Sequence, residues 1–244
     1  MNILFSQQAP SNLAPYENLQ NKFAANIDFV PFYLVEPLSA KEFRAEKINL
    51  PDYTAIVFSS RHAIDAYFKL CEEMRFKVPE TMKYFCTTEA VAMYLQKHIV
   101  YRKRKIFFGD GTPASVAGLV TAKHKGEKFL IATAANSTSE PFSGLFDAAG
   151  LDYKVGILVK SVTQDLKHLD LKSYDFVVLY NPSDVVSLKE NFPDFSQGDI
   201  KFVSFGKSIV KAMEEAGLQI EVKAPTPEAT SAAKAIELYL QNRK

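Results

Sequence analysis

One sixteen-residue pattern occurs twice in the sequence, and this repeat limits the folds that the chain can adopt. Ala24–Ser39 reads AANIDFVPFYLVEPLS and Ala148–Thr163 reads AAGLDYKVGILVKSVT, an offset of 124 positions without gaps. Each copy follows a predicted helix that ends at a residue suited to a C-cap, Asn26 or Gly150, and then stays extended for about a dozen residues. That is about twice the usual strand length. We therefore expect two long strands that begin in one domain and finish outside it, as paired crossings between two similar domains.

The repeat continues through the rest of the chain in the same order. Four further segments have partners about 120 positions later: Asn2–Ser6 with Lys128–Ala132, YTAIVFSSRHAI from Tyr53 with YDFVVLYNPSDV from Tyr174, FCTTEA from Phe85 with FGKSIV from Phe205, and Ile106 with Ile220. Predicted strands alternate with predicted helices throughout. Because parallel neighbours need a helical crossover, this alternation indicates an α/β fold with parallel sheets.

The two long segments also predict where the domains divide. We expect residues 1–34 and 164–244 to form a discontinuous first domain and residues 40–152 to form the second. Residues 32–39 and 153–163 would be the connector strands. The predicted fold class is α/β, with two similar parallel-sheet domains, flanking helices and a two-stranded antiparallel connector.

Composition excludes several classes of protein. The formal net charge is +1, which argues against a dedicated nucleic-acid binder. No apolar run approaches the roughly 18 residues of a membrane span, and the sequence MNILFSQQAP lacks the features of a signal peptide. Cys71 and Cys86 are the only cysteines and neither lies in a CxxC pair, which fits a reducing cytosol and disfavours zinc. We expect a cytoplasmic monomer that binds neither nucleic acid nor membrane.

Polar residues cluster just after the predicted strands, where open parallel sheets bind ligands. They also lie next to helix N-termini, which favour anions. The candidates for anion binding are Ser59, Ser60, Arg61, Thr87, Thr88, Asn181, Ser183, Gly206, Lys207 and Ser208, with Lys160 and Ser161 on the second connector strand. Ser6 and Gln7 follow the first strand in the same way. Each hydroxyl could instead be a simple N-cap. Together they favour an anion site in a cleft between the domains.

Common catalytic signatures are missing from the sequence. It contains no GxGxxG, GxxxxGK[ST], HExxH or GxSxG pattern, and the four histidines show no partner spacing. This favours chemistry in which a substrate that can already react is held in one geometry.

Four blocks of the sequence resemble the uroporphyrinogen-III synthase family. They are TAIVFSSRHAIDAYF, FVVLYNPSDVVSL, FVSFGKSIVKAMEEAG and APTPEATSAAKAI. The family often shows Thr/Ser-Ser-x-x-Ala-Val in the first block and Ser-Pro-Ser in the second. The third often carries Gly-x-x-Thr-Ala and the last Ala-x-x-Pro-Thr. The resemblance covers nearly the whole chain, and it rests on the order and spacing of these short motifs.

This resemblance implies both a fold and an activity. The fold is two α/β domains joined by a two-stranded ladder. The activity is cyclisation of linear hydroxymethylbilane to uroporphyrinogen III, with inversion of the last pyrrole ring through a spiro intermediate. No metal or organic cofactor is implied. Main-chain N–H groups and hydroxyls would bind the acetate and propionate groups of the substrate, and the candidates above would take this role.

The sequence departs from the family pattern at four places. Val159-Lys160-Ser161 stands where the returning connector usually has Tyr-x-Thr, and Ile209 replaces the Thr of Gly-x-x-Thr-Ala. Cys86 and Glu89 stand at the equivalent Gly and Thr of the first unit, and Asn181 replaces the Ser of Ser-Pro. The alternative is therefore a catalytically degenerate two-domain homologue that binds a small anionic or tetrapyrrole ligand.

Overall fold

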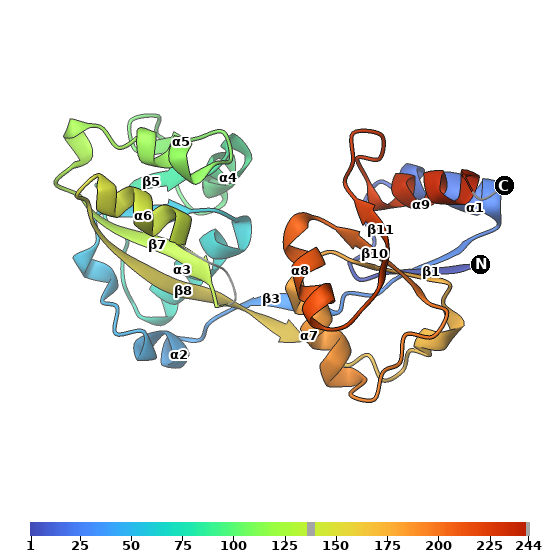
Figure 1. Cartoon of the computed structure of the whole chain (residues 1–244). Helices are drawn as coiled ribbons and strands as arrows, with labels where there is room; N and C mark the ends of the chain where they lie inside the picture. Colours follow the sequence, from blue (N-terminus) through green and yellow to red (C-terminus); the bar gives the residue numbers. More distant parts are fainter. Residues whose placement is uncertain (136–139, 243–244) are drawn as a thin grey trace. The chain divides into compact units, whose positions relative to one another are not determined.

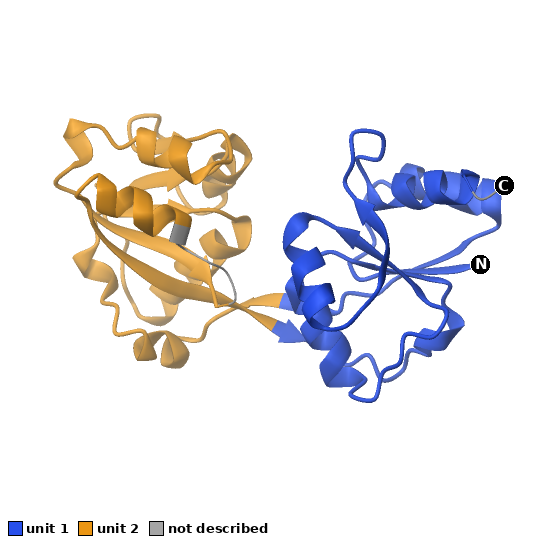
Figure 2. Ribbon diagram, in the orientation of Figure 1, with its two compact units in different colours: residues 1–34, 162–244 blue, residues 35–161 orange. Residues whose placement is uncertain are grey.

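The computed structural model describes residues 1–135 and 140–242. The chain divides into two compact units, which Figure 2 distinguishes by colour. Unit 1 contains residues 1–34 and 162–244, and unit 2 contains residues 35–161. Among the described helices, none is both long enough and apolar enough to cross a membrane.

Unit 1 is built on a five-stranded parallel sheet with the order β11-β10-β9-β1-β2. Its strands are β1 (Asn2–Phe5), β2 (Asn26–Phe29), β9 (Phe176–Leu179), β10 (Lys201–Phe205) and β11 (Ile220–Ala224). Helices α1 (Ala14–Phe23) and α9 (Ala232–Gln241) lie side by side on one face, and α7 (Pro182–Asn191) and α8 (Lys207–Glu215) pack together on the other (Figure 1). A short 3₁₀ helix spans Leu171–Ser173.

The strands of unit 1 are apolar on both sides because helices cover both faces of the sheet. Along β9, Phe176 and Val178 pack with Ile236 on one side, and Val177 and Leu179 pack with Met213 on the other. All four side chains of β9 are buried. The core of unit 1 therefore consists of two apolar layers separated by the sheet.

Unit 2 contains a six-stranded sheet with the order β3-β8-β7-β4-β5-β6. Its strands are β3 (Tyr33–Pro37), β4 (Ala55–Phe58), β5 (Lys83–Cys86), β6 (Ile106–Phe108), β7 (Lys128–Ala134) and β8 (Asp152–Thr163). Its helices are α2 (Ala40–Ala45), α3 (Arg61–Glu73), α4 (Glu89–Tyr94), α5 (Pro113–Gly118) and α6 (Glu140–Ala148), with 3₁₀ turns at Leu50–Asp52, Leu95–Lys97 and Ala122–His124. The five strands β4 to β8 pair in parallel.

The strand orders of the two sheets confirm the predicted fold class. Five strands of unit 2 occur in the order β6-β5-β4-β7-β8, and the five strands of unit 1 occur in the order β11-β10-β9-β1-β2. The two members of every predicted pair of repeated segments therefore hold the same position in their sheets. The repeat in the sequence is therefore a repeat of one βα arrangement.

The two connector segments pair in an antiparallel manner. The Leu38 N–H donates to the Leu158 carbonyl at 2.8 Å, and the Gln164 N–H donates to the Phe32 carbonyl at 3.0 Å. Residue numbers thus rise along one strand as they fall along the other. The expected continuous strand is present in the second copy, β8, but is wrong for the first, which breaks between β2 and β3. Pro31 lies in this break, and a proline has no N–H to donate to a ladder.

The predicted helix end at Asn26 is also wrong by two residues. The left-handed residue is Ala24, with φ 50°, and Asn26 already belongs to β2. Its N–H donates to the Met1 carbonyl at 2.8 Å, so strand pairing claims this residue. At the equivalent place in unit 2, Gly150 adopts the left-handed conformation as expected, with φ 63°.

Candidate functional site

The loops that follow β4, β5 and β6 are joined by backbone hydrogen bonds. The Thr87 N–H donates to the Phe58 carbonyl at 3.0 Å, the Gly109 N–H to the Cys86 carbonyl at 3.0 Å, and the Gly111 N–H to the Thr87 carbonyl at 2.8 Å. Parallel strands place their carboxyl ends at one edge of a sheet. The structure therefore brings the predicted residues 59–61 and 87–88 of unit 2 together with the loop 109–112.

Two of the predicted hydroxyls in unit 2 act as helix caps. The Ser60 hydroxyl accepts a hydrogen bond from the Ala63 N–H at 3.1 Å, and the Thr88 hydroxyl accepts one from the Val91 N–H at 3.3 Å. Both are the N-cap of the following helix. Thr87 is buried and donates to the Ser59 carbonyl at 3.4 Å. Ser60 and Thr88 therefore serve as N-caps, and each hydroxyl oxygen already accepts a hydrogen bond from its own helix.

Arg61 supplies a positive charge at this edge of unit 2. It is exposed, and its guanidinium lies over the ring of Tyr94, 5.4 Å from the centroid. Such a cation–π contact orients a guanidinium and leaves its N–H groups free to bind an anion. Ser59, beside it, is also exposed. Among the predicted residues here, Arg61 and Ser59 are exposed, Ser60 and Thr88 are half-buried, and Thr87 is buried.

Asp110 holds the loop after β6 in shape. Its carboxylate accepts hydrogen bonds from the Thr112 hydroxyl at 2.7 Å and from the Thr112 N–H at 3.0 Å. The Thr112 hydroxyl lowers the pKa of this carboxyl, and the Thr112 backbone N–H adds to the effect. A fully exposed carboxylate with a lowered pKa stays ionised, so Asp110 is a turn residue and not a proton donor.

Lys160 is already engaged by a carboxylate of unit 2. Its ammonium lies 2.5 Å from Glu42 Oε1, and the same glutamate closes a capping box with Ser39 at the start of α2. The hydrogen bond from Lys160 is the main reason that the pKa of Glu42 falls to about 2. Ser161 follows on β8 and is half-buried. A substrate carboxylate would have to compete with Glu42 for Lys160.

In unit 1, the N-terminus of α7 also holds a carboxylate of its own. Asp184 Oδ2 accepts hydrogen bonds from the N–H groups of Tyr180 at 2.8 Å and Asn181 at 2.9 Å. Asn181 Oδ1 in turn accepts from the Ser183 N–H at 3.0 Å. Asp184 is completely buried. The predicted site residues Asn181 and Ser183 are therefore parts of a filled helix cap.

Asp184 was not among the predicted site residues, yet it is the most unusual group in unit 1. Burial raises its pKa to about 6, against the opposing effect of its N–H donors and of Ser6. The Ser6 hydroxyl faces the carboxylate without reaching hydrogen-bond geometry, and Asp184 Oδ1 has no hydrogen-bond partner among the described residues. The signal in the sequence was the spacing of Asn181 and Asp184, which matches the N-cap and N3 positions of a capping box.

The N-terminus of α8 differs from the others. Its N-cap is Gly206, with φ 114° and ψ 162°, and no side chain within the described ranges caps the helix. The Gly206 N–H donates to the Ala224 carbonyl at 2.7 Å, which fixes this turn against β11. Lys207 and Ser208 are exposed in the first turn. This helix start combines uncapped N–H groups, the positive end of the helix dipole and a lysine, all of which favour an anion.

The two cysteines are excluded as nucleophiles by their surroundings. Cys71 and Cys86 are both buried free thiols, and burial raises the pKa of each to about 12. A thiol with such a pKa carries almost no thiolate at neutral pH. Residues 1–135 and 140–242 contain no group of three or more His, Cys, Asp and Glu residues placed to hold a metal ion.

A family model described as uroporphyrinogen-III synthase HemD matches residues 16–234. The chain belongs to the uroporphyrinogen-III synthase family. Among solved structures, the synthetase of Helicobacter pylori is similar at 15% identity and a TM-score of 0.59, covering 99% of both chains. A mutant enzyme of the extremely thermophilic bacterium Thermus thermophilus is similar at 13% identity and a TM-score of 0.56, also covering 99% of both chains. No curated protein sequence matches the chain.

Three departures from the family pattern lie in the cores and not at the exposed strand ends. Val159, Ile209 and Cys86 are each at most 4% exposed and belong to the apolar clusters of their units. Ile209 lies on the buried side of α8 and packs into the apolar cluster of unit 1. Lys207 and Ser208, which precede it, keep the exposed start of the helix polar. The anion-binding character of this turn therefore does not depend on position 209.

Proposed function

We propose that this chain acts as a uroporphyrinogen-III synthase, cyclising hydroxymethylbilane with inversion of the last pyrrole ring in tetrapyrrole biosynthesis. Membership of the family, through a match over residues 16–234, carries this proposal. The strand-end residues of each unit are consistent with it, because they present N–H groups and hydroxyls rather than acid–base pairs or metal ligands.

We further propose an order of importance among the substrate-binding residues. The start of α8, with Gly206, Lys207 and Ser208, is the strongest candidate for a substrate carboxylate because its N–H groups have no capping side chain among the described residues. Arg61 and Ser59 come next, since their side chains are exposed at the strand ends of unit 2. Ser60, Thr87, Thr88, Asn181, Ser183, Lys160 and Ser161 would contribute mainly by fixing the shape of the loops around them.

In this scheme the protein works by positioning. The substrate brings its own reactive group, a hydroxyl that takes up a proton and leaves as water. The carbon that carried this hydroxyl must then bond to the last pyrrole ring so as to form the spiro intermediate through which that ring inverts, and not by the direct closure that gives the type I isomer. Several carboxylate contacts that hold the chain of rings in one geometry supply that selection. Donors fixed in the backbone, such as the N–H groups at the start of α8, need no reorganisation during the reaction.

The alternative is a homologue that binds an anionic or tetrapyrrole ligand without turnover. Two observations favour it: Glu42 already pairs with Lys160, and Asp184 already fills the start of α7. Each of these carboxylates engages groups that the sequence predicts to bind the substrate, namely Lys160 and the N-terminus of α7.

A coupled assay separates these functions. Purified protein is supplied with hydroxymethylbilane made in the same reaction, and the oxidised products are separated by isomer. The synthase yields the type III isomer above the spontaneous type I background. Type I product alone, together with saturable binding of the bilane, would instead establish the non-catalytic homologue.

We also infer that the protein works as a cytoplasmic monomer. Two buried free thiols fit a reducing compartment. Light scattering on the purified protein tests the oligomeric state, with the mass of a single chain as the expected result.

A further inference from the structure

Unit 2 contains a cavity of about 190 Å³ at the amino ends of β5 and β6. The candidate substrate-binding loops follow the carboxyl ends of these same strands, so the cavity lies at the opposite edge of the sheet. Pockets for drug-sized ligands are typically about 300–1,000 Å³. This cavity is therefore too small for a tetrapyrrole and suits a single ring.

The walls of the cavity are set by strand pairing and two turns. The Tyr84 N–H donates to the Lys105 carbonyl at 2.8 Å, which fixes these two residues side by side. A turn from Arg102 to Lys105 closes through a 2.9 Å hydrogen bond, and another from Pro79 to Met82 through one of 3.0 Å. The cavity is thus held by backbone contacts and does not rely on long side chains for its shape.

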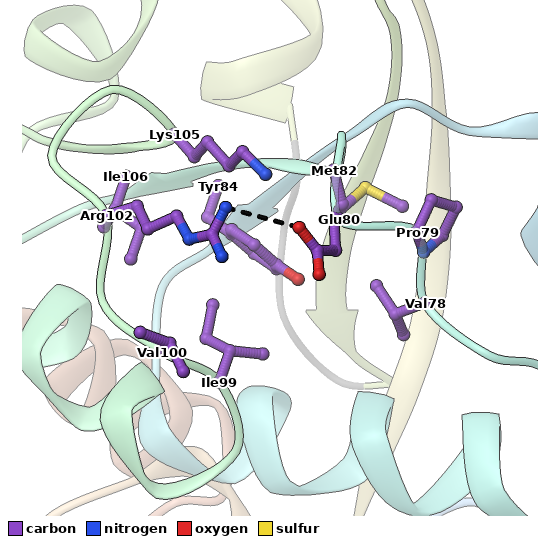
Figure 3. A pocket seen from close by; sticks show the side chains of 10 residues that line it. All are labelled: Val78, Pro79, Glu80, Met82, Tyr84, Ile99, Val100, Arg102, Lys105 and Ile106. Carbon is purple, nitrogen blue, oxygen red and sulfur yellow. Dashed lines mark hydrogen bonds and ion pairs between the residues drawn. The ribbon is translucent and has the colours of Figure 1, made fainter.

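Its interior is mostly apolar. Val78, Met82, Ile99 and Ile106 line it from three separate segments of the chain (Figure 3). Met82 and Ile106 are buried, and all four belong to or pack against the main apolar cluster of unit 2. These side chains offer a planar apolar group contacts on more than one side.

One polar group inside the cavity has no partner. Tyr84 lines the cavity, is 3% exposed, and its hydroxyl makes no hydrogen bond to any described residue. Figure 3 shows this hydroxyl among the side chains that line the cavity. The hydroxyl is not among the fully enclosed unpaired polar atoms of the described residues, so it opens onto the cavity. Buried tyrosines usually find a hydrogen-bond partner, and a ligand in the cavity could supply one. Burial also raises the pKa of Tyr84, so the phenol remains a neutral hydrogen-bond donor at physiological pH.

The rim of the cavity is positively charged. Arg102 pairs with Glu80 at 3.3 Å in an exposed ion pair, and such pairs contribute little and rearrange easily. Lys105 makes no ion pair with any residue in the described ranges, although it also lines the cavity. Lys103 and Arg104 stand exposed between them. Of these cations only Arg102 and Lys105 line the cavity, against the single carboxylate of Glu80, and this excess of positive charge favours a ligand that brings a negative charge to the rim.

We propose that this cavity is a second ligand site, which binds a small aromatic hydroxy acid. The ring lies among the apolar side chains, the hydroxyl of the ligand pairs with the Tyr84 hydroxyl, and the carboxylate meets Lys105 and Arg102 at the rim. The site is separate from the substrate-binding loops, and its occupancy does not depend on the proposed activity.

Titration calorimetry on the full chain tests the ligand chemistry. The probe is 4-hydroxybenzoate, with benzoate lacking the hydroxyl and 4-hydroxybenzamide lacking the charge as matched controls. One neutral hydrogen bond corresponds to about a 3- to 10-fold change in Kd, and a charged one to at least that much. The hydroxy acid should therefore bind more tightly than either control by at least about 3-fold. Equal affinities for all three, or no saturable binding of the hydroxy acid, would overturn the proposal.

Variants then place the ligand in the cavity. Tyr84→Phe should abolish the preference for 4-hydroxybenzoate over benzoate, and Lys105→Gln should reduce the preference for the acid over the amide. Lys103→Gln, which changes a neighbouring charge outside the cavity lining, is the control and should leave both preferences within about 2-fold. If Tyr84→Phe fails to fold, Lys105→Gln and the ligand series on the unaltered chain still decide the matter. Binding that ignores both substitutions would contradict the site.

Discussion

Unit 1 and unit 2 share one strand order, but the helices that follow equivalent strands begin differently. After β5, the chain passes through Thr87 before the hydroxyl of Thr88 caps α4. After the equivalent β10, it passes through Gly206 directly into α8, which has no side-chain cap among the described residues. After β4, Ser60 caps α3, whereas after β9 a buried carboxylate from Asp184 closes the start of α7.

This difference shows that a repeated scaffold does not imply repeated sites. Helix starts with their own caps have satisfied donors and little left to offer a ligand. The start of α8 keeps its donors, and we propose that it carries most of the anion binding in unit 1. The substitutions below test that contrast, from the largest expected effect to the smallest.

The largest loss of stability should follow Asp184→Ala. This change leaves the N–H groups of Tyr180 and Asn181 without their acceptor inside unit 1. A donor that loses its acceptor costs up to about 1–3 kcal/mol, these two lie in a part-buried cap, and release of the buried charge offsets part of that cost. We expect a net loss of about 2–4 kcal/mol, measured by urea unfolding at pH 7. A loss below about 0.5 kcal/mol would mean that the cap is not needed.

Asp184→Asn separates the charge of this residue from its capping role. The rise of its pKa from 3.8 to about 6 corresponds to about 3 kcal/mol. Because the folded state binds the proton more tightly, this contribution is fully present below pH 3.8 and is lost as pH rises through about 6. The wild type should therefore lose stability relative to the Asn variant between pH 4 and pH 7.5, by urea unfolding at both. If the difference in free energy of unfolding between wild type and variant were the same at both pH values, Asp184 would not be a buried carboxyl with a raised pKa.

Gly206→Ala should combine a smaller loss of stability with a clear loss of activity. With φ 114° and ψ 162°, Gly206 occupies a region open almost only to glycine, although a Cβ there would meet no neighbouring atom among the described residues. We expect about 1–3 kcal/mol of destabilisation from backbone strain and at least roughly a 10-fold loss of type III product, because the first turn of α8 must move. Gly198→Ala, with φ 55°, is the control and should cost about 1 kcal/mol without loss of activity.

Thr88→Ala and Ser208→Ala compare a capped start with an uncapped one. Thr88 caps α4, so its removal should cost about 1 kcal/mol in thermal or urea unfolding. Ser208 caps nothing that the structure describes and is exposed, so its removal should leave stability within about 0.5 kcal/mol. Its effect should instead be a raised KM for hydroxymethylbilane. If both variants behave wild-type in stability and in KM, the contrast between the units is wrong.

The smallest effect should come from Glu42→Gln, which breaks the exposed pair with Lys160. The hydrogen bond from Lys160 is the first cause that lowers the pKa of Glu42 from 4.5 to about 2. The stabilisation is therefore present above pH 4.5 and lost as pH falls through about 2. The Tm difference between wild type and variant should be small at pH 7 and vanish at pH 2. Glu46→Gln, a neighbouring carboxylate for which the described structure records no pair, should show no such trend.

The equivalence of strands between the two units could be predicted from the sequence because it follows from pattern alone. The repeated segments β1/β7, β2/β8, β9/β4, β10/β5 and β11/β6 are recognisable by alternation and by offset, and the two members of each pair hold equivalent positions in their sheets. The sequence pattern does not reveal the break at Pro31, because Val30 and Phe32 keep the segment apolar on either side of it. The pattern does not reveal the helix end at Ala24 either, because alanine rarely adopts the left-handed conformation.

The site was less predictable because capping and ligand binding use the same residue types. Thr88 and Ser208 occupy equivalent positions in the repeat, but only the structure shows that one is a cap and the other lies inside the first turn. Asp184 and Lys160 depend on partners that local sequence patterns do not reveal, namely a buried environment and a glutamate 118 positions away. The sequence can predict which residues follow the carboxyl ends of strands. It cannot predict which of the helix starts there keep N–H groups that no side chain caps.

The central contrast is tested most directly by amide resonances during a titration with uroporphyrin III, a stable tetrapyrrole with the same acetate and propionate groups. If the uncapped start of α8 binds a carboxylate, the N–H signals of Lys207 and Ser208 should shift with saturation. Those of Ser183 and Asp184, in the filled cap of α7, should stay in place. Shifts at the start of α7 without shifts at the start of α8 would contradict the account.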